Sequence, residues 1–275
     1  LVPLLHTCLD IADCRARVVA ICAQVPEYNF VAKYDLIQQI RAYPPTAERT
    51  LNGPEFRRHV HMFTRGNHLL ANELLADIER GCVLGFDPDN PPHNLSQKPA
   101  HWFRSFREAA FILDTVIKEA RRAILIPSKL RPLYFINFFS VPKKASDGTM
   151  SALRAIRNGK YCARGTFSVN HFIRDEAWRI RTLPKLTTYA SLLIGKNYMA
   201  LRDLSDAFRQ LLLAASEQPY CGYSLFGQWW NDTRVAYGMS SSAASCQRFV
   251  ELICTIFNKV SINRRFKRKG APDIR

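Results

Sequence analysis

The stretch Leu201-Arg-Asp-Leu-Ser-Asp-Ala-Phe-Arg-Gln210 decides how the rest of the sequence is interpreted. Apolar Met199 and Leu201 lead into Asp203 at the end of a predicted strand, and Phe208 follows five residues later. Mg²⁺ prefers carboxylate oxygens and keeps coordination places open for phosphates. The stretch therefore suits a metal ion beside a nucleotide sugar. An aspartate that caps the following helix is the simpler interpretation of this stretch alone, so the remaining sequence has to decide.

Composition indicates a globular protein with an anionic partner. The 275 residues suffice for one large or two ordinary domains, and the hydrophobic content of 47% is ordinary for such proteins. The charge is unusual, because 39 lysines and arginines face 23 aspartates and glutamates, which gives a net charge of +16. Such an excess indicates nucleic acid first, an anionic membrane second and a merely solvated surface third.

The cysteines and the apolar segments indicate the cellular compartment in which we expect the protein. The eight cysteines include no CxxC pair, which predicts reduced thiols in the cytoplasm or nucleus rather than a disulfide frame or a zinc site. No uninterrupted apolar run reaches the roughly 18 residues of a membrane span, so we expect no membrane partner. The opening Leu1-Val-Pro-Leu-Leu-His6 is unlike a signal peptide, and a start at leucine leads us to expect an internal piece of a longer protein.

Apolar periodicity predicts an α+β fold. Predicted helices cover residues 11–25, 35–42, 69–78, 106–124 and 189–194, with a further long helix that opens at 237–239. Predicted strands cover residues 133–141, 198–204, 211–214, 220–225 and 229–236. A turn at 146–148 joins the strand at 133–141 to a second arm near 153–156 and makes a hairpin, with Lys143, Lys144 and Arg154 near its tip. These basic residues are either solvated, as is common on hairpins, or form a mobile finger that closes on a triphosphate.

Four blocks, taken in order, resemble the reverse transcriptase domain of retroelements over about residues 106–275. The blocks are the helix 106–124 with Ile124-Leu-Ile-Pro-Ser128; Phe139-Ser-Val-Pro-Lys-Lys144 with Asp147-Gly148 and Arg154-Ala-Ile156; Leu183-Pro-Lys-Leu186 with residues 192–210; and Tyr237-Gly-Met-Ser-Ser-Ser-Ala-Ala-Ser-Cys-Gln247. The second block has a few extra residues in its loop, and the last has Ala243 where the family usually has proline. The segment Leu69–Phe86 is similar to the region upstream of this domain in DIRS-type retrotransposons, which carry a tyrosine recombinase.

The resemblance implies an RNA-directed DNA polymerase that adds deoxynucleotides to a primer 3′ end. Asp203 and the carbonyl of Leu204 would bind Mg²⁺ in a two-ion site, where the 3′-hydroxyl attacks the α-phosphate. Phe208 would block the 2′-hydroxyl of a ribonucleotide. This disfavours another interpretation, an RNA-templated RNA polymerase. The remaining implied nucleotide-binding residues are Lys143 and Arg154 at the triphosphate, the N–H groups of Asp206 and Ala207, and Tyr237 with Gly238 beside the nucleotide and template. The implied partners are an RNA or DNA template–primer and deoxynucleoside triphosphates.

The resemblance also implies a right-hand polymerase architecture with fingers and a partial palm. We expect a mostly helical N-terminal extension over 1–104, fingers with the basic hairpin over 105–185, and a partial palm over 186–275 into which the fingers hairpin 211–236 is inserted. The family's second carboxylate source is a Y-x-D-D motif, and the chain contains no Asp-Asp pair. Asp273 in Pro272-Asp-Ile274 resembles the entry to that motif, so we expect this chain to be a fragment that is inactive alone. The alternative from another class is a non-catalytic, nucleic-acid-binding relic.

Overall fold

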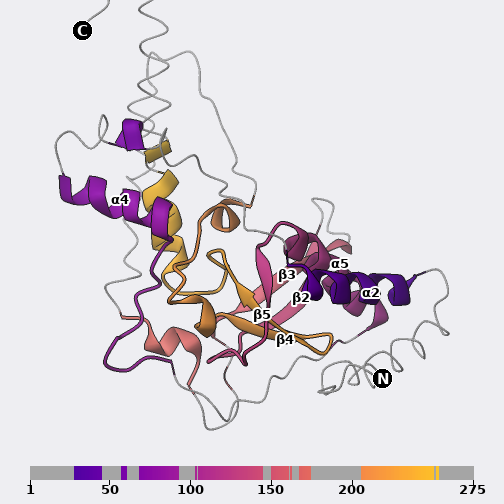
Figure 1. The fold of residues 1–275 in the computed structure, drawn as a ribbon. Helices are drawn as coiled ribbons and strands as arrows, with labels where there is room; N and C mark the ends of the chain where they lie inside the picture. Colours follow the sequence, from indigo (N-terminus) through magenta and orange to yellow (C-terminus); the bar gives the residue numbers. More distant parts are fainter. Residues whose placement is uncertain are drawn as a thin grey trace, which may run out of the picture.

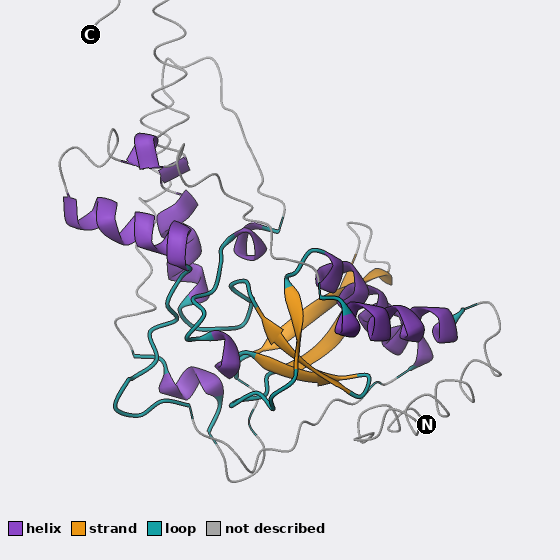
Figure 2. Ribbon diagram, in the orientation of Figure 1, coloured by secondary structure: helices purple, strands orange, loops and turns teal. Residues whose placement is uncertain are grey.

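The computed structural model describes residues 28–44, 57–60, 68–92, 103, 105–144, 150–160, 162, 167–174, 206–250 and 252–253. These residues form a mixed α+β structure, as the sequence predicts (Figure 2). The elements are α2 (Phe30–Ala42), α4 (His68–Arg80), α5 (Phe106–Arg121), β1 (Leu125–Ser128), β2 (Asn137–Lys144), β3 (Met150–Asn158), η2 (Val169–Phe172), η4 (Ala207–Gln210), η5 (Gln218–Tyr220), β4 (Gly222–Leu225) and β5 (Gln228–Asp232), and residues 242–250 and 252–253 are also helical. The segments predicted at 11–25, 146–148, 189–194 and 198–204 lie outside the described residues.

Helix α5 is the amphipathic helix that the sequence predicts. Its N-cap is Ser105, whose side chain accepts a hydrogen bond from the Glu108 N–H at 3.2 Å and so satisfies a free donor of the first turn. Its buried face consists of Glu108, Ala109, Ile112, Leu113, Val116, Ile117 and Ala120. The helix ends at Arg121, three residues earlier than predicted, because Ala123 adopts a left-handed φ of 49°.

Helix α2 lies along α5 (Figure 1). The rings of Phe30 and Phe106 meet edge to face with centroids 4.9 Å apart. The Tyr28 hydroxyl donates to the carbonyl of Ala110 at 3.1 Å and to Asp114 at 2.9 Å. The part of the predicted N-terminal extension that forms α2 therefore shares its core with α5.

The first sheet has the strand order β1-β5-β4, and all its pairs are antiparallel. Strands β4 and β5 form a hairpin around Phe226 and Gly227, whose φ values of 55° and 72° suit a tight turn. Trp230 on β5 is fully buried. Strand β1 pairs with β5 from Leu125↔Asp232 to Ser128↔Trp229, so two segments more than a hundred residues apart are neighbours.

The second sheet is the predicted basic hairpin, formed by β2 and β3. One face packs on α5: Phe138, Ser140 and Arg157 are buried there, and Glu108 accepts hydrogen bonds from the backbone N–H and hydroxyl of Ser140 at 3.1 Å. The first strand was predicted over 133–141, and its start is wrong. Residues 133–136 bond instead to the carbonyls of Pro219 and Gly222 beside the first sheet, and β2 begins at Asn137.

A predicted strand over 211–214 is also wrong in type. Leu212 forms an isolated bridge with Arg234, and Leu213 forms another with Cys82. This segment therefore divides its backbone hydrogen bonds between two partners and builds no continuous ladder. The strand predicted over 229–236 ends at Asp232, and the one predicted over 220–225 begins at Gly222.

Two hydrophobic cores result. The larger one joins α2 and α5 to both sheets. The smaller one joins α4 to the helical residues 242–250 and 252–253, through Leu74, Leu75, Ile78, Phe249 and Leu252. No helix among the described residues combines the length and apolar character that crossing a membrane requires.

Candidate functional site

A cavity of about 750 Å³ lies between α5, β3 and the turn that leads into η4. Its lining comes from segments that are far apart in the sequence. The lining residues are Phe111, Asp114, Thr115, Lys118, Glu119, Arg122 and Ile124 from α5 and its C-terminal turn, Arg154, Ala155, Ile156 and Arg157 from β3, and Asp206, Arg209 and Tyr237. This volume falls within the usual range for sites that bind small molecules.

Three of the predicted nucleotide-binding residues meet at this cavity, namely Arg154, Asp206 and Tyr237. Phe208 lies behind Tyr237, and the two ring centroids are 4.3 Å apart. Phe208 and Ala207 also pack against the smaller hydrophobic core, and neither lines the cavity. The structure therefore brings most of the predicted set into one neighbourhood but divides it between the cavity wall and the packing behind it.

Lys143 lies on the hairpin face that also carries Arg154. Its cross-strand partner is Ala152, whereas the partner of Arg154 is Val141, so the two basic residues are diagonal neighbours on the same face. Lys143 is exposed and is not among the residues that line the cavity.

The lining of this cavity is positively charged overall. Five basic and three acidic residues line it, which leaves an excess of positive charge. Neither Arg154 nor Lys118 forms an ion pair with any described residue. Unpaired cations in a hollow attract an anion more strongly than cations already matched by carboxylates.

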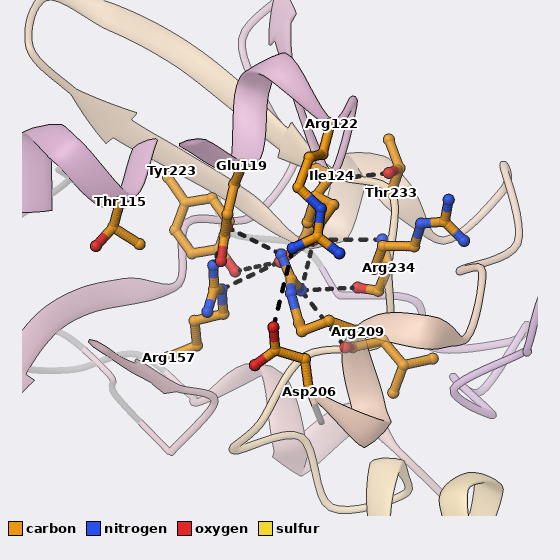
Figure 3. Close-up of polar contacts among 12 residues, drawn as sticks. Thr115, Glu119, Arg122, Ile124, Arg157, Asp206, Arg209, Tyr223, Thr233 and Arg234 are labelled. Atoms are coloured by element: carbon orange, nitrogen blue, oxygen red, sulfur yellow. Dashed lines mark hydrogen bonds and ion pairs between the residues drawn. The ribbon is translucent and has the colours of Figure 1, made fainter. Parts of the chain in front are cut away.

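Asp206 has an uncommon backbone conformation, with a left-handed φ of 51° at the start of η4. The Arg209 N–H donates to its carbonyl at 2.7 Å. Its carboxylate lies 3.9 Å from the guanidinium of Arg122, and Figure 3 shows these two side chains facing each other. Burial and the nearby Asp206 carboxylate raise the pKa of the Tyr237 hydroxyl, so this ring presents a neutral hydroxyl.

A largely buried network of charged groups forms part of the cavity wall and extends inward from it to Asp232 (Figure 3). Arg157 and Arg209 are each only 4% exposed, and both contact the Glu119 carboxylate, Arg209 at 3.1 Å. Both also contact Asp232, which is fully buried, at 3.4 Å for Arg157 and 2.8 Å for Arg209. The Tyr223 hydroxyl donates to Asp232 at 2.8 Å. Two arginines thus match two carboxylates in a largely buried environment.

These contacts keep Glu119 ionised, Arg157 and Arg209 protonated, and the Tyr223 hydroxyl neutral. Burial raises the pKa of Glu119, but Arg157 and Arg209 outweigh that effect, so its pKa is lowered. Burial lowers the pKa of Arg157 and Arg209, but Glu119 and Asp232 raise both above the ordinary value. Burial and the charge of Asp232 raise the pKa of Tyr223, which keeps its proton.

The turn that carries Tyr237 and Gly238 is held by Asn170. The Asn170 side-chain amide donates to the Gly238 carbonyl at 2.9 Å, and its oxygen accepts from the Ser240 N–H at 3.0 Å. Gly238 has φ 94°, and a Cβ there would lie 1.9 Å from the Arg157 carbonyl oxygen. Only glycine fits at this position without displacing β3.

The predicted metal ligands Asp203 and Leu204 lie outside the described residues. Within the described part of the chain, no group of three histidine, cysteine, aspartate or glutamate side chains could hold a metal ion.

Neither the contribution of α5 to the cavity nor the buried network was predicted from the sequence. Thr115, Lys118, Glu119 and Arg122 recur at helical spacing, so they form one polar stripe on α5, and this stripe faces the cavity. That periodicity was visible, but polar stripes on helices are usually solvated. Nothing in the sequence pairs Glu119 with Arg157 and Arg209, because the three lie on separate elements.

A scan of the chain against protein-family models found no match, and a search of curated proteins also found none.

Proposed function

We propose that this chain binds a deoxynucleoside triphosphate and a template–primer as part of an RNA-directed DNA polymerase domain of a retroelement, with a fingers and partial palm arrangement. The observation that supports this most is the convergence of Arg154, Asp206 and Tyr237 on one positively charged cavity. The four sequence blocks assigned those three residues to the nucleotide. They lie up to 83 positions apart, so their proximity is independent of the sequence match.

In this proposal the triphosphate lies against Arg154 and Lys118. A guanidinium offers several N–H donors in a fixed plane and an ammonium offers three, and both match phosphate oxygens. The deoxyribose faces Tyr237, which Phe208 supports from behind. Mg²⁺ bound by Asp203 and Leu204 would neutralise charge that develops on the phosphates.

Equilibrium binding of a fluorescent deoxynucleoside triphosphate to the purified chain tests the proposal. Arg154→Ala should weaken binding about tenfold or more, because a charge-assisted contact is worth roughly 1.5–3 kcal/mol. Arg41→Ala is the matched control, since Arg41 is an exposed arginine in the last turn of α2, away from the cavity. Equal affinity of Arg154→Ala and Arg41→Ala would contradict the assignment of Arg154.

The same measurement separates the proposal from a non-catalytic, nucleic-acid-binding relic. Both possibilities expect the chain to bind a template–primer, because both retain the net charge of +16. Only the polymerase proposal expects saturable binding of the free nucleotide. Template–primer binding without any nucleotide binding would favour the relic.

A further inference from the structure

One carboxylate oxygen connects two walls of the cavity. Oε2 of Glu119 accepts hydrogen bonds from the guanidinium groups of both Arg157 and Arg209. Arg157 lies on β3, three residues after Arg154. Arg209 lies on η4, three residues after Asp206. Figure 3 shows Glu119 descending from α5 between the two arginines.

The two arginines have little freedom to respond if this oxygen is lost. Each is also held by Asp232 on the opposite side, and Arg209 donates in addition to the carbonyls of Arg234 and Val235 at 3.3 and 3.4 Å. Without Glu119 the network would contain two buried positive groups and one buried carboxylate. Mutual repulsion at low effective dielectric would then separate β3 from η4.

We infer that Glu119 is a positioning residue that sets the spacing between Arg154 and Asp206 and thereby the affinity of the cavity for a triphosphate. This inference rests on the proposed function. Glu119 touches the arginines and acts on the ligand only through the segments that they anchor.

A purely electrostatic role and a positioning role of Glu119 predict opposite effects of its neutralisation on nucleotide affinity. Glu119 is itself one of the three acidic residues that line the cavity. If it acted only through its charge, its neutralisation would make the cavity more positive and would tighten triphosphate binding. As a positioning residue, its neutralisation weakens binding although the cavity becomes more positive.

The experiment measures the dissociation constant of a fluorescent deoxynucleoside triphosphate for the unmodified chain and four variants, each with its melting temperature. We expect Glu119→Gln to weaken binding about tenfold or more. Glu119→Asp keeps the charge but is one methylene shorter, and we expect about threefold weaker binding. Asp114→Asn removes another carboxylate from the same cavity without touching the two arginines, and we expect about twofold tighter binding.

Ile37→Ala is the control for general loss of stability. Ile37 is fully buried where α2 packs on α5, so its truncation should lower the melting temperature without changing nucleotide affinity. Weaker binding by the Glu119 variants at a melting temperature matched by Ile37→Ala supports a positioning role. If Glu119→Gln does not fold, the nucleotide affinity of Glu119→Asp is compared with that of Ile37→Ala, and weaker binding by Glu119→Asp supports the positioning role.

Two outcomes would overturn the inference, and they differ in scope. If folded Glu119→Gln binds the nucleotide as tightly as the unmodified chain or more tightly, the positioning role alone is overturned. If Glu119→Gln does not fold, the same result for Glu119→Asp overturns it. Absence of nucleotide binding by the unmodified chain overturns the proposed function as well.

Discussion

Glu217 is a buried carboxyl group that forms no ion pair with a lysine or arginine in the described part of the chain. Its side chain is 7% exposed, and the described contact to its carboxylate is the Leu84 N–H, which donates to Oε2 at 3.2 Å. Burial raises the pKa of Glu217 to about 7, although the hydrogen bond from Leu84 opposes the rise. The Glu217 carboxyl group connects the segment after α4 to the turn before η5, so its ionisation changes the stability of that contact.

We expect this residue to make stability depend on pH. Its pKa is higher in the folded than in the unfolded chain, so the folded chain binds more protons between about pH 4.5 and 7. The free energy of unfolding therefore falls by roughly 2–3 kcal/mol as the pH rises through that window. Glu217→Gln should remove this dependence, because an amide does not ionise. Its oxygen can still accept the hydrogen bond from the Leu84 N–H, so the contact itself is retained. Urea unfolding of both proteins at pH 5 and pH 8 measures it.

Glu73→Gln provides the control for this prediction. Glu73 is an exposed glutamate on α4, and its replacement changes the net charge by the same amount. If Glu73→Gln and Glu217→Gln shift the pH dependence equally, the effect is one of overall charge and the burial of Glu217 is not its cause.

At the scale of elements, the turn at residues 237–240 depends on a side chain from a different segment. Asn170 belongs to η2, and its two hydrogen bonds to Gly238 and Ser240 are the contacts that fix this turn against the end of β3. The Asn170 N–H also donates to the Gly159 carbonyl at 3.2 Å. One residue thus joins the end of β3 to the turn that carries Tyr237.

Asn170→Ala should destabilise the fold by about 1–3 kcal/mol, because it removes both side-chain hydrogen bonds. Asn170→Asp is the informative comparison. A carboxylate still accepts from Ser240 but cannot donate to the Gly238 carbonyl, so we expect an intermediate loss. Thermal unfolding followed by far-ultraviolet circular dichroism measures the stability of both variants. If Asn170→Asp is as stable as the unmodified chain, the hydrogen bond to the Gly238 carbonyl is dispensable.

The elements that could be predicted from sequence are those whose residues form them locally. Helix α5 shows its apolar period and its Ser105 cap in the sequence itself, and Gly81 ends α4 with a positive φ of 97°. Strand β1 was not predicted, because its four residues include Pro127 and acquire strand geometry only by pairing with β5. Arg154, Asp206 and Tyr237, which the sequence assigned to the nucleotide, line one cavity, and that assignment stays a prediction. The network around Glu119 could not be predicted, since it depends on tertiary packing alone.

At the scale of the whole molecule, a net charge of +16 favours binding to a polyanion, and the proposed partner is nucleic acid. Binding of an RNA–DNA template–primer should fall steeply with salt, by about 10³-fold between 50 and 200 mM if some six phosphates are neutralised. Fluorescence anisotropy at several salt concentrations gives the slope. An uncharged peptide nucleic acid duplex of the same sequence is the control and should not bind. A slope that corresponds to one phosphate or none would contradict the nucleic-acid assignment.

The pairing of β1 with β5 has a consequence for how the chain is made. Leu125 leaves the ribosome more than a hundred residues before its partner Asp232. At about 5–20 residues per second, the first sheet lacks its central strand for roughly 5–20 s. Through that interval β1 lacks the strand that pairs with it, so we expect the emerging chain to be most prone to aggregation before β5 has been synthesised.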